Sequence, residues 1–212
     1  MSDSARDAER VRRTKVALRD RLITLRRSLP ETVRRAADQS VQDSTLTRVR
    51  AQKLTVCAAY VPIGTEPGGA DLPDRLAEAC TVLLPVLLPD GDLDWAEYDG
   101  TTTRTPRGLF EPTGPRLGPG VITEVPLIVV PALAVSRDGI RMGRGGGSYD
   151  RVLARAGDAR TIALLHDGEL LDGVPAEPHD RRVGAVITPG GGLITTPAGA
   201  SSRRPAGRNK LR

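Results

Sequence analysis

Hydrophobic residues recur along this chain with two different periods, and these periods predict helices that alternate with strands. Within residues 4–29 the side chains of one stripe recur at steps of three and four, which places them on one helical face. The stripe consists of Val11, Lys15, Leu18, Leu22, Leu25 and Leu29, so it contains one cation. Ser28, Pro30 and Glu31 form a helix-start pattern that predicts a second helix over residues 31–48.

Continuous apolar runs of strand length follow the two helices. These runs lie at 54–63, 81–89, 126–135, 161–165 and 185–188, and residues 92–98 alternate like an antiparallel edge strand. Short helices are expected at 71–80 and 148–156, whereas residues 100–124 are rich in loop formers. Because helices alternate with buried strands, we predict an α/β fold, a mostly parallel sheet flanked by helices on both faces.

Length and charge add a domain prediction. A chain of 212 residues suits one domain, which we expect over residues 1–188, with a disordered basic tail over 189–212. The net charge is +5, and the tail carries five basic residues and no acid from Arg203 onward, so the body is nearly neutral. This balance argues against a specific nucleic-acid partner. Weak, nonspecific nucleic-acid binding through the tail remains an alternative.

The cysteines and the chain start bear on location. Cys57 and Cys80 sit in apolar runs without a C-x-x-C partner and are expected to be reduced core residues. The first residues lack an apolar signal region, and no apolar stretch reaches the about 18 residues of a membrane span. We therefore expect a cytoplasmic protein with no membrane contact, and a monomer because no long amphipathic segment is left unassigned.

The segment GIRMGRGGGSYD, residues 139–150, is the strongest candidate for chemistry. Its glycines allow positive φ angles and a close backbone approach, so that consecutive N–H groups can form an anion nest before a helix. Arg141 and Arg144 add full positive charges suited to phosphate oxygens. The spacing matches neither a P-loop nor a dinucleotide fingerprint. The alternative is a flexible turn with Ser148 as the helix N-cap.

Other charged residues admit two interpretations each. Asp150, in the first turn of the helix at 148–156, either complements the helix dipole or holds Mg²⁺ beside a phosphate. Lys15 either extends to solvent at the end of the apolar seam or, with Arg19 one turn later, faces a phosphate. Glu66 and the pair His179-Asp180 lie in loop sequences, where solvated side chains are the default.

Together these pieces resemble a known family over about residues 11–188. The matching elements are the K-x-x-x-R of Lys15 and Arg19, Glu66 in YVPIGTE, GLFEP at 108–112, VPALAVSRDGIRMGRGGGSYD at 130–150 and E-x-H-D at 177–180. The glycine and aspartate spacing is the most specific of them. The family is that of the 5-formyltetrahydrofolate cyclo-ligases, also called methenyltetrahydrofolate synthetases.

The resemblance implies an α/β fold like that of ribose-5-phosphate isomerase and CoA transferases. It implies ATP- and Mg²⁺-dependent closure of 5-formyltetrahydrofolate to 5,10-methenyltetrahydrofolate, with ADP and phosphate as the other products. By position, the ATP-binding residues are Lys15, Arg19, Arg141, Gly143, Arg144, Gly145, Gly146, Gly147, Ser148 and Tyr149. The folate-binding residues are Val61, Glu66 and Arg144 to Ser148, and the Mg²⁺ ligands are Asp150 and Asp180.

The sequence departs from the family pattern at three places. The family's Phe-Asp before the loop is Val135-Ser136 here, its first tyrosine in Tyr-Tyr-Asp is Ser148, and an aspartate after His-Asp is Gly184. These departures keep a second hypothesis open, a nucleotide- or phosphate-binding member of the same fold whose folate site has degenerated.

Overall fold

The structure is a computed structural model that describes residues 3–201. Its helices are α1 (Asp3–Ser28), α2 (Glu31–Ala51), α3 (Leu72–Ala77), the 3-10 helix η1 (Pro119–Glu124), α4 (Ser148–Arg155) and α5 (Pro197–Ser201). Its first strands are β1 (Val56–Ala58), β2 (Thr81–Leu87), β3 (Leu93–Glu97), β4 (Thr102–Arg104), β5 (Phe110–Pro112) and β6 (Leu127–Pro131). The later strands are β7 (Ala134–Ser136), β8 (Arg141–Met142), β9 (Arg160–Leu164), β10 (Leu170–Leu171), β11 (Ala185–Thr188) and β12 (Gly192–Thr195). None of the helices in 3–201 has the length and apolar content that a bilayer crossing requires.

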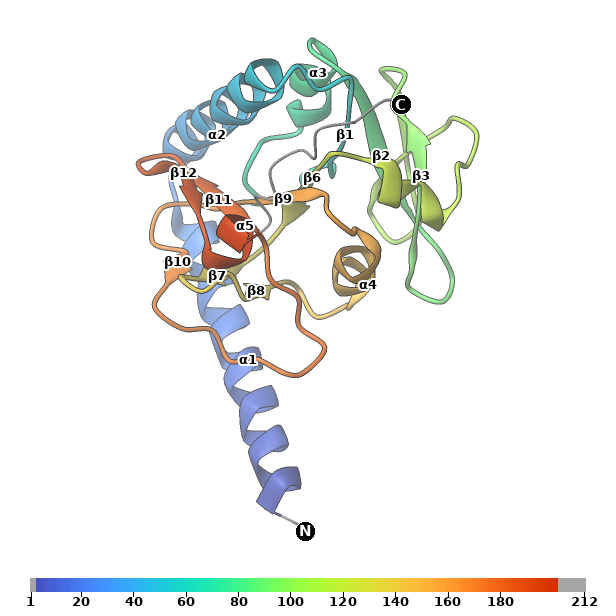
Figure 1. Ribbon diagram of the computed structural model, residues 1–212. Coiled ribbons are helices and arrows are strands. Elements are labelled where there is room, and N and C mark those ends of the chain that lie inside the picture. Colours follow the sequence, from blue (N-terminus) through green and yellow to red (C-terminus); the bar gives the residue numbers. More distant parts are fainter. Residues whose placement is uncertain (1–2, 202–212) are drawn as a thin grey trace, which may run out of the picture.

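A seven-stranded sheet in the order β12-β11-β9-β6-β1-β2-β3 forms the centre of the molecule (Figure 1). The strands from β11 to β2 pair in parallel, and β3 and β12 add antiparallel edges. The predicted α/β class, the mostly parallel sheet and the antiparallel edge strand near 92–98 are thereby confirmed.

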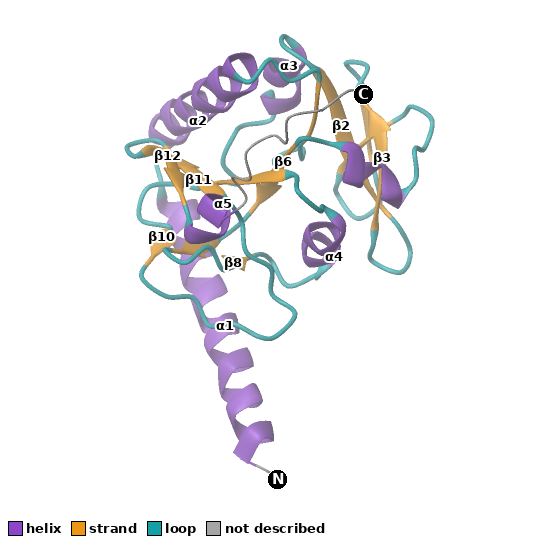
Figure 2. Cartoon of the chain, in the orientation of Figure 1, coloured by secondary structure: helices purple, strands orange, loops and turns teal. Residues whose placement is uncertain are grey.

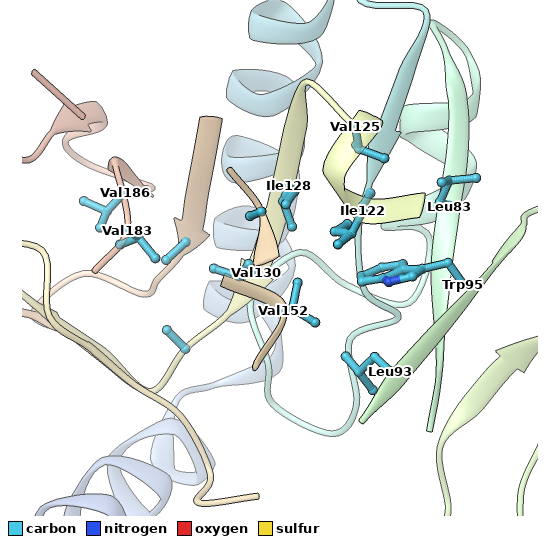
Figure 3. Packing of buried hydrophobic residues seen from close by; sticks show 14 of the residues in the cluster. Leu83, Leu93, Trp95, Ile122, Val125, Ile128, Val130, Val152, Val183 and Val186 are labelled. Carbon is cyan, nitrogen blue, oxygen red and sulfur yellow. The ribbon is translucent and has the colours of Figure 1, made fainter. Parts of the chain in front are cut away.

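Helices cover both faces of this sheet, as predicted (Figure 2). On one face α2 and α3 bury Val41, Val49, Leu72 and Leu76 against the strands. On the other face α4 and η1 pack around the fully buried indole of Trp95, with Ile122 and Val152 in the same cluster (Figure 3). The central strands are buried on both sides, which explains why they read as continuous apolar runs.

The predicted strand 126–135 is two strands in two sheets. β6 ends in the central sheet at Pro131, whose ring nitrogen has no hydrogen to extend the ladder. The chain then turns, and the Leu133 amide donates to the Met142 carbonyl at 2.7 Å as β7 joins β8 and β10 in a three-stranded sheet. α1 packs against this small sheet through Leu22, which clusters with Leu133 and Met142. The turn brings α1 close to the carboxyl ends of the central strands.

Three further boundaries differ from the sequence prediction. Of the run 54–63 only Val56–Ala58 pairs as a strand, and the loop-rich region 100–124 contains the β4–β5 hairpin and η1. The predicted disorder from residue 189 is wrong up to Ser201, because β12 pairs with β11 and α5 follows it. The structured chain therefore continues past 188, and the remaining tail, 202–212, lies outside the described residues.

Candidate active site

One cavity of about 540 Å³ lies where α1, the loop after β1, the glycine loop and the segment 177–180 meet. Every residue that the sequence assigned to a site lines it. From α1, the β1 loop and the 177–180 segment come Lys15, Arg19, Val61, Glu66 and Asp180. From the glycine loop and the start of α4 come Arg141, Gly143, Arg144, Gly145, Gly146, Gly147, Ser148, Tyr149 and Asp150. The fold thus gathers residues from four distant parts of the chain around one space.

Lys15 is held inside the protein by two carboxylates. Its Nζ donates to Glu177 Oε2 at 2.9 Å and to Asp180 Oδ2 at 2.5 Å, and only 4% of its side chain is exposed. The hydrogen bond from Lys15 is the main cause that lowers the pKa of Glu177. Extension of Lys15 to solvent is therefore the wrong interpretation. The solvated-loop default is also wrong for Asp180, which is 9% exposed, although it fits His179 at 66%.

Arg19 lies beside the glycine loop with its charge uncompensated. Its Nε donates to the Gly143 carbonyl at 3.0 Å, and its guanidinium lies about 3.5 Å from where a β-carbon on Gly145 would stand. Within residues 3–201 no carboxylate lies within ion-pair distance of Arg19. Lys15 and Arg19 are one helical turn apart, and Arg19 is the cation of the pair that remains free to meet an anion.

Arg141 ties the glycine loop to the start of α4. Its guanidinium is 4% exposed and donates to Asp150 Oδ1 at 3.0 Å and to the Pro131 carbonyl at 3.2 Å. A β-carbon on Gly143 would lie 2.6 Å from Arg141 Nη1, so any side chain at this position would have to displace the Arg141 guanidinium. Asp150 therefore both faces the cavity and anchors a buried arginine, which goes beyond the helix-dipole role considered for it.

The first residues of α4 line the cavity. The N-cap of this helix is Gly147 in the left-handed region at φ 72°, with no side-chain capping bond, so the alternative in which Ser148 is the N-cap is wrong. A glycine there leaves the first amides of the helix without a competing side-chain acceptor. Gly145, at φ 103°, shapes the preceding turn. Backbone N–H groups and the helix dipole together make this end a suitable anion site.

Tyr149 lies behind the loop. Burial raises the pKa of its phenol above its ordinary value. Its hydroxyl has no hydrogen-bond partner in the part of the chain that the structure describes. The Arg141 guanidinium carbon stands 5.9 Å from the ring centroid, within cation–π distance. The ring thus adds a cation–π interaction to the hydrogen bonds of Arg141.

Two hydrogen bonds fix the carboxylate of Glu66, and one of them comes from the glycine loop. Its Oε1 accepts from Arg144 Nε at 2.8 Å, and its Oε2 accepts from the Ile63 amide at 3.1 Å. The carboxylate is 9% exposed whereas Arg144 is 47% exposed. Glu66 is therefore not the solvated loop residue that its sequence context indicated, and Arg144 bridges it to the loop.

The carboxylate oxygens of Asp150 and Asp180 are suitable ligands for a divalent ion that is also bound to phosphate. Among residues 3–201 no group of three or more His, Cys, Asp and Glu side chains is arranged to hold a metal. The two aspartates are neighbours on the wall, because the Arg181 amide donates to Asp150 Oδ1 at 3.3 Å. Mg²⁺ commonly takes one or two carboxylates together with phosphate oxygens and waters, so these oxygen donors fit such an ion.

Sequence reasoning missed a buried pair at the deep end of the cavity. Arg26, 1% exposed, lines the cavity wall and donates to both Glu169 oxygens at 2.7 Å and to the Ala132 carbonyl at 2.6 Å. The helical face runs through Lys15, Leu22 and Arg26, whereas Leu25 is 52% exposed. Extending the spacing of Lys15 and Leu22 by four residues would have found Arg26. Glu177 was noted only as part of a motif, without its role as the partner of Lys15.

Comparison with known proteins agrees with this geometry. The sequence pattern of the 5-formyltetrahydrofolate cyclo-ligase family matches residues 11–189. A protein of Mycolicibacterium smegmatis named 5-formyltetrahydrofolate cyclo-ligase is 44% identical over 190 residues, which cover 86% of this chain and 97% of that protein. An Escherichia coli K12 protein of the same name is 33% identical over 70 residues, 32% of this chain and 38% of that one.

Solved structures share the fold. The NMR structure of a 5,10-methenyltetrahydrofolate synthetase from Aquifex aeolicus superposes with a TM-score of 0.75 and 22% identity, covering 93% of this chain and 99% of that one. A synthetase of the same name from Mycoplasma pneumoniae gives a TM-score of 0.66 and 19% identity over 81% and 96% of the two chains. The extent of these matches shows that the chain belongs to the 5-formyltetrahydrofolate cyclo-ligase family.

Proposed function

We propose that this protein uses ATP to convert 5-formyltetrahydrofolate into 5,10-methenyltetrahydrofolate, with release of ADP and phosphate. Family membership gives the reaction class. The observation that carries the proposal to these residues is the shared cavity. It is lined by the glycine loop, the start of α4, the Glu66 loop and Arg19, which forms no ion pair among the described residues.

The glycine-loop side has the features of a phosphate site. Phosphoryl transfer requires positioning and charge neutralisation more than a protein nucleophile. The Arg19 guanidinium and the amides before α4 would bind the terminal phosphates of ATP. Arg141 is occupied by Asp150 and the Pro131 carbonyl, so its contribution is to hold the loop and the carboxylate in place.

The proposed reaction has two steps, a phosphoryl transfer and a ring closure. The formyl oxygen attacks the γ-phosphorus of ATP, a new O–P bond forms, and the bond from that phosphorus to the ADP oxygen breaks. Nitrogen-10 of the folate then attacks the activated formyl carbon and loses its proton to water. The carbon–oxygen bond breaks, the ring closes, and the former formyl oxygen leaves within inorganic phosphate. The poor leaving group of a formamide thus becomes a good one.

Asp150 and Asp180 would hold Mg²⁺ together with phosphate oxygens, and the ion would supply additional neutralisation of phosphate charge. Each aspartate already bonds a cation through one oxygen, Asp150 with Arg141 and Asp180 with Lys15. These ion pairs would restrict the orientation of the two carboxylates before a ligand binds. Glu66 would orient a polar edge of the pterin, since its carboxylate is fixed at two points beside Val61 in the same wall.

A near-ultraviolet absorbance assay tests the proposal. Protein, 5-formyltetrahydrofolate and Mg²⁺ are mixed with and without ATP, and the absorption band of the methenyl product is followed. Growth of the band only with ATP, with one ADP per product, is the expected result. Calorimetric binding of ATP without any product would instead assign the chain to a member that lost the folate reaction, in keeping with serine at position 148.

A further inference from the structure

A second cavity of about 450 Å³ adjoins the first. It lies between the start of α2, the loop after β1 and the β4–β5 hairpin, and we call it the outer cavity. Ile63, Glu66 and Phe110 line both spaces. A long ligand would pass from one cavity to the other along these three residues, and we call this shared boundary the passage.

The acids of the outer cavity are already engaged. Glu31 forms an ion pair with Arg35 one turn along α2, and Glu66 is paired with Arg144. Asp38 accepts a hydrogen bond from the Gly68 amide at 2.8 Å, and burial raises its pKa. The charge of Arg34 also acts on Asp38 and lowers its pKa against the larger effect of burial.

Two arginines of the outer cavity form no ion pair among the described residues. Arg104, on β4, has no carboxylate within ion-pair distance in the range 3–201, and neither has Arg34 on α2. Arg34 donates only a long bond of 3.4 Å to the Leu29 carbonyl. Guanidinium groups are well suited to carboxylates, which they can bind through two parallel hydrogen bonds. The outer cavity thus offers two cations to an anionic ligand.

Two of the three residues of the passage are apolar, and Glu66 is the third. Phe110 is one of the large hydrophobic side chains that remain exposed, at 40%, and it lies in this passage with Ile63. An exposed aromatic ring beside a cavity favours the binding of a flat apolar group, because the contact removes apolar surface of both groups from water. The passage therefore suits an aromatic segment between two polar ends.

We infer that the outer cavity binds the glutamyl carboxylates of the folate at Arg34 and Arg104, with the aminobenzoyl ring between Ile63 and Phe110. The inference rests on the proposed function, because a folate consists of a pterin, an aminobenzoyl ring and a glutamyl tail in that order. With the pterin beside Val61 and Glu66, the ring enters the passage and the tail reaches the two arginines. Arg34 and Arg104 are then specificity-determining residues for the tail.

Kinetics with two substrates test this inference. One substrate is 5-formyltetrahydrofolate and the other is 5-formyltetrahydropteroate, which lacks the glutamate. Arg34→Gln and Arg104→Gln are each expected to raise KM for the glutamate-bearing substrate by about 2- to 5-fold, as for an exposed ion pair. KM for the pteroate and kcat for both substrates are expected to stay unchanged. Salt should raise the first KM in the wild type and less in the variants.

Arg107→Gln is the matched control, because Arg107 is exposed on the same hairpin and lines neither cavity. Phe110→Ala should raise KM for both substrates, since both carry the ring. Equal effects of the arginine variants on the two substrates, or none on either, would overturn the inference. If the wild type forms no methenyl product, the proposed function fails. Calorimetric affinities of the wild type and the variants for the same two folates then test separately whether the outer cavity binds the glutamyl tail.

Discussion

Replacing Lys15 with methionine removes an ammonium from between two carboxylates while keeping a side chain of similar length. In the wild type Nζ bonds Glu177 and Asp180, and the three side chains are 4%, 17% and 9% exposed. Removing one partner of a buried ion pair leaves uncompensated charge in a poorly hydrated place, which typically costs about 3–5 kcal/mol.

The cost at this position falls toward the lower end of that range. Glu177 keeps Arg12, whose Nε lies 3.3 Å from Oε1, and Asp180 keeps the Glu177 amide at 2.6 Å. We therefore expect the free energy of unfolding to fall by about 3 kcal/mol at neutral pH. The double variant with Asp180→Asn should lose less than the sum of the two single losses, because both changes remove the same interaction.

The loss should also depend on pH. Lys15 is the main cause of the lowered pKa of Glu177, whose ordinary value is 4.5. Stability from this pair is present above that ordinary value and is lost as pH falls through the lower native pKa. Urea unfolding of the wild type and Lys15→Met should therefore show a smaller difference near pH 3, about the lowest usable value, than at neutral pH.

Arg10→Met provides the control, because Arg10 lies on the same helix in an exposed pair with Asp7. Its free energy of unfolding should change by less than about 0.5 kcal/mol. If Lys15→Met behaves like this control, or if its loss is the same at both pH values, the buried pair does not stabilise the fold as argued.

Three further predictions concern the loop and the tail. Gly143→Ala should displace the Arg141 guanidinium, raise KM for ATP and lower the free energy of unfolding by about 1–3 kcal/mol. Gly146→Ala is the control, because its β-carbon would meet Ser148 at an ordinary distance of 3.8 Å, and it should leave the urea midpoint nearly unchanged. Arg19→Gln should weaken ATP binding, measured by calorimetry, about 10- to 100-fold, because a charge-assisted contact to phosphate is lost. The melting temperature should change little, because the Arg19 side chain bonds only the Gly143 carbonyl in the protein. An unchanged affinity would exclude Arg19 from the phosphate site. Deletion of residues 202–212 should leave kcat/KM unchanged, since every predicted site residue lies at or before Asp180, and should abolish any salt-sensitive RNA binding; a loss of activity would give the tail a catalytic role.

The features predicted correctly depend on local pattern. Strands buried on both faces produce apolar runs, so the α/β class and the parallel sheet followed from the sequence. The glycine loop could be predicted because adjacent glycines in the sequence indicate a backbone that needs positive φ angles, as Gly145 has in the structure.

The features predicted incorrectly depend on contacts distant in sequence. The environment of Lys15 is set by Glu177 and Asp180, more than 160 residues away, and helical spacing on α1 carries no information about them. The strand breaks after Pro131 because β7 pairs with β8 in the small sheet. Residues 192–195 form β12 because they pair with β11, which would otherwise be the edge strand of the central sheet. Local composition at 192–195 gave no sign of that edge.

Isotope transfer tests the proposed chemistry most directly. 5-Formyltetrahydrofolate labelled with oxygen-18 in the formyl group is converted with unlabelled ATP, and the inorganic phosphate is analysed by mass spectrometry. Attack of the formyl oxygen on the γ-phosphorus predicts one labelled oxygen in each phosphate released. Methenyl product accompanied by unlabelled phosphate, with the label in water, would contradict a phosphorylated formyl group and the role assigned to this cavity.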